Sequence, residues 1–270
     1  MNEHNLREQV AAATSYEELF VPALFKQWAP LVINSANVQS GHRILDVACG
    51  TGILAREAAS RVGPSGYTAG LDIAAGMLEV ARRIAPAIDW KQGPAEALPF
   101  PDRSFDAVVS QFGLMFFTDR EKSMREMLRV LVLGGRLSVA VFDSLSNLSA
   151  YADEVALLER SAGKKAADAL RAPFVLGQKD GLTQLARKVG INALEVTTHK
   201  GTARFPSIRT LVEADLRVWL PVMAVILDEE KIQQILADAE QALSAYVDEH
   251  GQAVFSVSAH IISGSKSKLF

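Results

Sequence analysis

The segment 43–52 constrains the fold of this chain more than any other part of the sequence. Residues 44–48 are aliphatic apart from Asp46 and predict a buried β-strand, which runs directly into the small-residue turn 49–52. Residues 53–62 keep apolar side chains three and four positions apart and predict a helix immediately after this turn. In such an arrangement a ligand can approach the backbone N–H groups of the turn closely. We therefore interpret the turn as a cofactor-binding loop.

Short β-branched runs alternate with segments of helical period through roughly the first half of the chain. This alternation is typical of βαβ units and a parallel sheet. The second half is mostly helical and includes a long amphipathic helix over 228–249. The sequence therefore predicts an α/β fold, a Rossmann-like, doubly wound, mainly parallel seven-stranded sheet with helical cap insertions. The expected strands are 43–48, 67–72, 88–92, 107–111, 135–142, 194–203 and 253–263, and the expected crossover helices are 53–62, 77–85 and 121–131.

The predicted elements divide the chain into a cofactor-binding core and added helical segments that we expect to cover it. The expected parts are an N-terminal helical lid (1–40), the core (41–145), a helical insertion with a return helix (146–192), a core strand (193–206), a helical cap (207–251) and a final core strand with a tail (252–270).

Composition and charge exclude several classes of function. Apolar residues make up 49% of the 270 residues and charged residues 22%, as in ordinary globular proteins with a sizeable core. The net charge of -3 gives no basic field, which argues against nucleic acid as a partner. The longest apolar run, 218–227, contains Pro221 and is shorter than the roughly 20 residues of a membrane span. We therefore expect no nucleic acid and no membrane span.

Cysteine and histidine usage bear on compartment and metal binding. The single cysteine, Cys49, fits a reducing compartment, and the first residues lack the apolar core of a signal peptide. A cytoplasmic location is therefore expected. The protein is also expected to be a monomer or a homodimer. The five histidines are scattered without the paired spacing of a metal site, so no metal is expected. Cys49 itself is expected to be a small buried loop residue, because no histidine lies beside it in a recognisable pattern.

Asp72 lies twenty residues beyond Gly52, at the predicted end of the second strand. A carboxylate at this place can accept hydrogen bonds from both hydroxyls of a ribose. It could instead cap the helix that follows. We favour the ribose, so the glycine turn and Asp72 together indicate an adenosine.

Two classes of cofactor share this layout, and Gly50, Gly52 and Ala55 satisfy the loose GxGxxA pattern of dinucleotide enzymes. Asp46, just before the turn, separates the two classes. A pyrophosphate beside this carboxylate would be repelled by roughly 4 kcal/mol at about 4 Å and an effective dielectric of 20. The protonated amine and sulfonium of S-adenosylmethionine would be attracted. The alternatives are an NAD-dependent oxidoreductase and a non-catalytic adenosyl-binding partner subunit.

The segment 45–52, Leu-Asp-Val-Ala-Cys-Gly-Thr-Gly, resembles the first motif of class I S-adenosylmethionine-dependent methyltransferases. Further matches follow in the order expected for that family, and together they cover about 41–142. The similarity is to the branch that includes ubiquinone and menaquinone biosynthesis methyltransferases. It implies an enzyme that uses S-adenosylmethionine to methylate a small, apolar or aromatic molecule. The further matching segments are 70–72, 93–100, 104–106, 129–131 and 134–137.

The resemblance also assigns roles in the cofactor site. Asp46 and the glycine turn would hold the methionine end, Asp72 the ribose, and Ile73 would lie against the adenine. Pro94 stands where an acidic residue that bonds the adenine amine is common, so the backbone N–H of Ala95 would recognise the ring. The residues assigned to the cofactor are Tyr16, Asp46, Ala48, Gly50, Gly52, Asp72, Ile73, Met77, Pro94, Ala95, Glu96, Gln111 and Phe112.

The acceptor pocket is expected to be apolar. Met115 stands where many relatives carry histidine, so an acid-base role at that position is lost and the catalytic residue is left unassigned. The aromatic residues of the lid could instead pack on the core, and the apolar residues near Pro221 could instead form a dimer face. The residues assigned to the acceptor pocket are Phe20, Trp28, Met115, Phe116, Trp219 and Met223.

Overall fold

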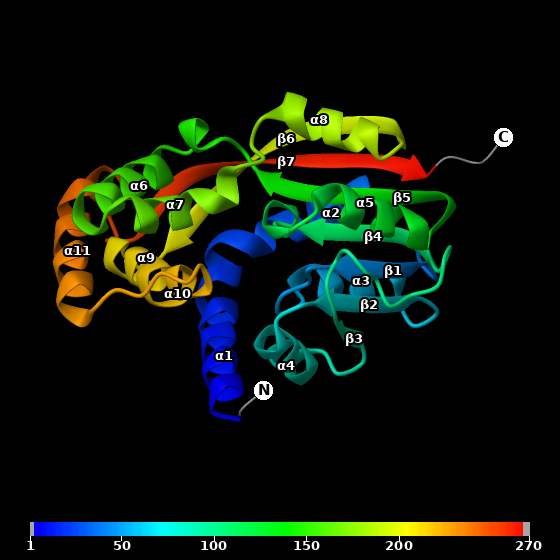
Figure 1. The fold of residues 1–270 in the computed structure, drawn as a ribbon, viewed down its shortest axis with the longest axis horizontal. Coiled ribbons are helices and arrows are strands. Elements are labelled where there is room, and N and C mark those ends of the chain that lie inside the picture. The colour runs from blue at the N-terminus through cyan, green and yellow to red at the C-terminus, as the bar shows by residue number, and fades with distance from the viewer. Residues whose placement is uncertain (1–2, 267–270) are drawn as a thin grey trace.

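A seven-stranded sheet in the order β3-β2-β1-β4-β5-β7-β6 runs through the computed structural model, which describes residues 3–266 (Figure 1). The first five strands are parallel, and β7 lies antiparallel to both β5 and β6. This confirms the predicted doubly wound, mainly parallel sheet. The strands are β1 (Arg43–Val47), β2 (Tyr67–Asp72), β3 (Asp89–Gln92), β4 (Phe105–Gln111), β5 (Leu131–Phe142), β6 (Ile191–Phe205) and β7 (Ala253–Lys266).

β1 lies at the centre of the cofactor half of the sheet, between β2 and β4. Its apolar side chains Ile44, Leu45 and Val47 are completely buried. Continuous apolar runs of this kind are typical of parallel strands covered on both faces. Asp46 interrupts the run opposite Gly70 of β2 and near the end of the strand.

Helices cover this sheet. The crossovers between parallel strands are α3, which packs on β1 and β2, α4 on β2 and β3, and α5 on β4 and β5, while α8 covers the antiparallel pair β6 and β7. Asp119 caps α5, because its side chain accepts a hydrogen bond from the N–H of Lys122. These helices are α3 (Ile53–Val62), α4 (Ala75–Ile84), α5 (Arg120–Val130) and α8 (Lys179–Lys188).

β6 and β7 are longer than predicted and extend past the other strands into a helical lobe (Figure 1). The predicted long helix 228–249 ends already at Ala242, where Leu243 leaves helical geometry and a short turn, η7 (Ser244–Tyr246), follows. The lobe helices are α6 (Ser149–Ala162), α7 (Lys164–Arg171), α9 (Ile208–Ala214), α10 (Leu220–Val222) and α11 (Glu229–Ala242), with short helical turns η3 (Leu114–Phe116), η4 (Leu145–Asn147), η5 (Ala172–Phe174) and η6 (Asp215–Trp219) elsewhere between the elements.

The N-terminal segment bridges the cofactor half of the sheet and the helical lobe. α1 packs closely on α4 at Gly76, where an added Cβ would lie 2.5 Å from the backbone of Gln9. Further along, the side chain of Gln27 bonds both the N–H and the carbonyl of Thr202 in β6, each at 2.9 Å. The elements of this segment are α1 (Glu3–Ser15), the π-helix η1 (Tyr16–Phe25), η2 (Lys26–Trp28) and α2 (Ala29–Ser35).

Residues 1–2 of the expected lid and residues 267–270 of the expected tail lie outside the described part of the chain. Within the described range, no helix is long and apolar enough to cross a membrane.

Candidate active site

A cavity of about 690 Å³ opens at the carboxyl ends of β1, β2 and β4. The strand order reverses at β1, with β2 and β3 on one side and β4 on the other. In open α/β sheets ligands bind in the crevice at this switch point. Of the predicted site residues, those that line this cavity are Tyr16, Asp46, Ala48, Gly50, Asp72, Ile73, Met77, Pro94, Ala95, Glu96, Gln111, Phe112, Met115, Phe116, Trp219 and Met223.

Two residues with unusual backbone conformations line this cavity. Ala48 and Phe112, at the ends of β1 and β4, have φ angles of 57° and 56° although neither is glycine. The two strand ends also approach closely, because a Cβ added at Gly113 would lie 2.5 Å from the Cβ of Ala48. Such strained positions cluster at ligand sites, where surrounding structure holds them.

Asp46 lies completely buried in the wall of the cavity. Neither of its carboxyl oxygens meets a hydrogen-bond partner among the described residues. Burial and the nearby charge of Asp72 raise the pKa of Asp46 well above its usual range. Buried polar groups normally have partners. The position therefore suits a ligand that brings a positive charge or hydrogen-bond donors to this wall.

Asp72 organises the glycine turn. Its Oδ2 accepts a hydrogen bond from the N–H of Gly50 and its Oδ1 one from the N–H of Ala74, both at 2.8 Å. Ala74, not Asp72, is the N-terminal cap of α4. A carboxylate offers about four acceptor positions, so both oxygens retain capacity for ligand hydroxyls. Asp72 is thus more than the helix cap that the sequence offered as an alternative.

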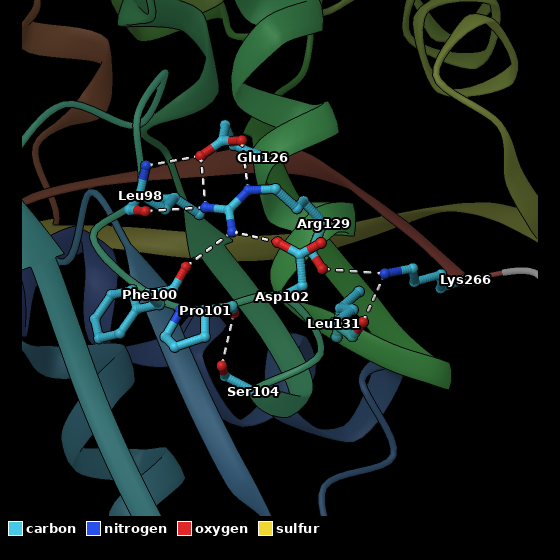
Figure 2. Close-up of polar contacts among 9 residues, drawn as sticks. All are labelled: Leu98, Phe100, Pro101, Asp102, Ser104, Glu126, Arg129, Leu131 and Lys266. Carbon is cyan, nitrogen blue, oxygen red and sulfur yellow. Dashed lines mark hydrogen bonds and ion pairs between the residues drawn. The ribbon is translucent and has the colours of Figure 1, made fainter.

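The loop 93–102, which contributes Pro94, Ala95 and Glu96 to the cavity, is fixed from behind by α5. Figure 2 shows Arg129 of α5 donating to the carbonyl oxygens of Leu98 (2.9 Å) and Phe100 (2.8 Å).

The same guanidinium is held by two carboxylates. Arg129 bonds both carboxylate oxygens of Glu126, at 2.7 and 2.8 Å, and Asp102 at 2.8 Å. Glu126 in turn accepts from the N–H of Leu98 at 2.9 Å. All donor directions of the planar guanidinium are therefore used. Sequence reasoning noted Arg129 only as part of a matching segment, because nothing in the sequence reveals that it clamps this loop.

Tyr16, the first residue of η1, lines the larger cavity. Its ring stacks on Phe25 with a centroid distance of 5.3 Å. Burial and the nearby charge of Asp72 raise the pKa of Tyr16, so the hydroxyl stays protonated. An ion pair of 2.6 Å between Glu17 and Arg56 ties this segment to α3.

A second cavity, of about 150 Å³, adjoins the first and shares several lining residues with it, among them Tyr16, Met115, Phe116 and Trp219. Phe20 contributes to its wall. Beyond these, its lining is supplied largely by the insertion and the cap, so we call it the acceptor cavity. Its further lining residues are Leu24, Phe25, Met77, Phe112, Phe142, Tyr151, Leu170, Pro173, Phe174, Asp215, Val218 and Val222.

Two predicted site residues lie elsewhere. Gly52 faces Trp90 rather than either cavity, and an added Cβ would lie 2.4 Å from the indole ring, so this glycine serves close packing. Trp28 was expected in the acceptor pocket, but it is completely buried in the core, edge-on to Phe112, and lines neither cavity. Sequence reasoning missed Arg120, which lines the larger cavity.

Cys49 is not expected to act as a nucleophile. Burial and the charges of Asp46 and Asp72 raise the pKa of the Cys49 thiol well above its usual range, which makes it a poor nucleophile. Among the residues that the structure describes, no group of three or more potential ligands could hold a metal ion.

The chain is similar to known methyltransferases in sequence. Residues 15–154 match the model of the ubiE/COQ5 methyltransferase family. The chain is 41% identical over 136 residues to the ubiquinone/menaquinone biosynthesis C-methyltransferase UbiE of Hahella chejuensis, a match that covers 48% of the chain and 55% of that protein. It spans about half the length of the curated relatives it matches.

Solved structures share the fold. The YcgJ protein of Bacillus subtilis is similar with a TM-score of 0.59 and 20% identity, over 90% of this chain and 99% of that one. Phosphoethanolamine N-methyltransferase 2 of Haemonchus contortus is similar with a TM-score of 0.60 and 18% identity, over 96% of this chain and 58% of that one.

The family match confirms the resemblance inferred from the sequence. It covers more than half of the chain and includes Asp46, the glycine turn and Asp72, which together form the wall of the larger cavity. The chain therefore belongs to the ubiE/COQ5 methyltransferase family.

Proposed function

We propose that this protein transfers a methyl group from S-adenosylmethionine to a small, apolar or aromatic acceptor. The observation that supports this most strongly is Asp46, a buried carboxyl group without a partner in the cavity wall. The amine and sulfonium of S-adenosylmethionine bring positive charge to such a position. The Asp46 carboxylate would repel the pyrophosphate of NAD by roughly 4 kcal/mol at a distance of about 4 Å and an effective dielectric of 20.

The residues of the larger cavity fit the cofactor part by part. Asp46 and the turn at Gly50 would hold the methionine end, where Gln111 and Phe112 also line the wall. Asp72 would accept hydrogen bonds from the ribose. The adenine would lie among side chains of α4 and the clamped loop. The residues proposed for the adenine are Ile73, Met77, Pro94, Ala95 and Glu96.

S-adenosylmethionine, when bound, supplies an already activated methyl group. The protein then has to orient the acceptor and exclude water. Segments 1–40, 146–192 and 207–251 would do this as lid and cap over the core. Tyr16, Phe116 and Trp219 line both cavities and would separate the two ligands from solvent at their junction.

The name of the relatives, ubiquinone/menaquinone biosynthesis C-methyltransferase, favours an aromatic acceptor related to quinones. Much of the acceptor cavity is built by residues after 154, where the family match ends. Specificity for the acceptor can therefore differ from that of the relatives while the cofactor site is kept.

Thermal denaturation with two ligands tests the proposal. A ligand present at a hundred times its dissociation constant adds about 2.7 kcal/mol of stability. S-adenosylhomocysteine, which keeps the adenosyl and amine groups, should therefore raise the melting temperature, and NADH at the same concentration should not. A shift with NADH alone would contradict the proposal.

A further inference from the structure

The acceptor cavity contains a charged group in a wall that is otherwise mostly aromatic and aliphatic. Its volume of about 150 Å³ is that of an apolar cavity that holds a single benzene ring. Rings of Phe142, Phe174 and Tyr151 form part of the wall. Asp215, at the start of η6, lines the same wall.

Asp215 in this cavity wall is a buried carboxyl group that is only partly paired. The residue is 4% exposed, and its Oδ2 has no hydrogen-bond partner among the described residues. An unpaired buried acceptor is costly. Substrate-binding residues tolerate such a cost because the ligand supplies the missing partner.

Behind Asp215 lies a second carboxyl group, Glu154 of α6, which is completely buried and does not line the cavity. The two side chains are within hydrogen-bonding reach of each other. Two carboxyl groups this close cannot both ionise readily. Burial and the charge of Asp215 raise the pKa of Glu154 well above its usual range, which favours the protonated form of Glu154.

No cation neutralises this pair within the described part of the chain. Arg217, two residues after Asp215, is bonded instead to Glu213 and Glu229 at the surface. Tyr151 of α6 is also near the pair, and its hydroxyl stays protonated because burial and the two carboxyl groups raise its pKa. Asp215 therefore lines the cavity without a cationic partner among the described residues.

We propose that Asp215, supported by Glu154, is a specificity-determining residue that selects a single-ring acceptor carrying a hydrogen-bond donor, either a hydroxyl or an ammonium group. This rests on the proposed methyltransferase function. The aromatic walls hold the ring, Asp215 fixes its donor group at one end of the cavity, and the opposite side of the ring is turned toward the junction with the cofactor cavity.

Binding of three small probes to the full chain tests this. Phenol, benzylamine and toluene share one ring and differ in their donor group. In the presence of saturating S-adenosylhomocysteine at pH 8, calorimetry should show phenol or benzylamine binding at least about tenfold more tightly than toluene, as a hydrogen bond to a charged acceptor implies. Preference for phenol identifies a hydroxyl, and preference for benzylamine an ammonium.

Variants separate the role of Asp215 from general effects on folding. Asp215→Leu should abolish the preference, and Asp215→Asn should abolish it for benzylamine and weaken it for phenol. Asp153→Asn is the matched control, because Asp153 lies on α6 beside Glu154 but bonds Tyr246 at the surface. This variant should keep the full preference.

Two results would overturn the inference: equal binding of the three probes by the parent protein, or a preference that persists in Asp215→Leu. Binding of S-adenosylhomocysteine, measured on the same samples, tests folding and the proposed function separately. If it binds all variants while the probes show no preference, only the inference about Asp215 fails. If the parent does not bind it, the proposed function fails.

Discussion

At the scale of single residues, the chemistry of this protein is set by carboxyl groups in the cavity walls. Asp46 and Asp72 lie in the cofactor cavity and Asp215 in the acceptor cavity, and burial raises the pKa of all three. Their surroundings differ. Asp72 already accepts from two backbone N–H groups, whereas the other two have oxygens without a hydrogen-bond partner among the described residues.

Replacing Asp72 should affect both stability and cofactor binding. Asp72→Ala leaves the N–H groups of Gly50 and Ala74 without their acceptor, which should cost about 1–3 kcal/mol for each group that stays buried. Affinity for S-adenosylhomocysteine should fall at least about tenfold. Asp72→Asn keeps one acceptor oxygen, so its stability and its affinity should lie between those of the parent and Asp72→Ala. Urea denaturation and calorimetry measure these effects, and parent-like affinity in folded Asp72→Ala would disprove the ribose assignment.

Asp215 should make stability depend on pH. Its pKa is about 7 in the folded protein, against about 3.9 for an ordinary aspartate. Between these values the folded state binds more protons than the unfolded state, so the free energy of unfolding should decrease as pH rises from about 4 to about 7.

The comparison with Asp215→Asn isolates this contribution. As pH rises through this range, the variant should gain stability relative to the parent, because it lacks a carboxyl group that must ionise while buried. Urea denaturation at several pH values measures it, with Asp153→Asn as the control. Identical pH dependence of the parent and Asp215→Asn would show that Asp215 is ionised normally.

At the scale of elements, the sequence predicts the cofactor half better than the helical lobe. Apolar runs such as Ile44 to Val47 identify buried parallel strands because they are covered on both faces. β6 begins before and ends after the predicted strand 194–203, because it pairs with β7 from Ile191 to Phe205, and the polar residues Asn192 and Arg204 obscure its ends. The early end of α11 at Ala242 was missed because apolar spacing continues beyond it.

The hydrogen bonds that hold loop 93–102 should be lost when the guanidinium of Arg129 is removed. Lysine cannot reproduce the planar set of donors that reaches Leu98, Phe100 and both carboxylates. We expect Arg129→Lys to lower stability by about 1–3 kcal/mol and the affinity for S-adenosylhomocysteine about tenfold. Arg125→Lys is the control, because Arg125 lies one turn earlier on α5 and makes an exposed pair with Glu121. Equal effects of both substitutions would contradict the clamp.

At the scale of the whole molecule, segments distant in sequence enclose the two cavities. Residues in the first half identify the cofactor site because Asp46, Asp72 and Gln111 lie at or near the carboxyl ends of strands. The acceptor site could be predicted only partly, because Asp215 and Glu154 meet through the packing of separate helices and neither stands in a recognisable pattern. Trp28 was misplaced for the same reason, since an aromatic residue in the lid can face either the core or the cavity.

We expect η1 of the N-terminal lid to exchange its amide hydrogens more slowly when the cofactor site is filled. Because Tyr16 lines the cofactor cavity and η1 is tied to both halves of the molecule, S-adenosylhomocysteine should slow amide hydrogen exchange in η1. α8, which packs on β6 and β7 at the far end of the sheet, should exchange as before. Protection confined to the strand ends would contradict a lid role for η1.

The central claim is that Asp46 selects a cationic adenosyl cofactor, and calorimetric titration of Asp46→Asn with S-adenosylmethionine tests it most directly. The variant should be at least as stable as the parent at pH 8, because it removes a buried, unpaired carboxyl group. Its affinity for S-adenosylmethionine should nevertheless fall at least about tenfold. Parent-like affinity in the folded variant, or tighter binding of NADH than of S-adenosylmethionine by the parent, would contradict the account.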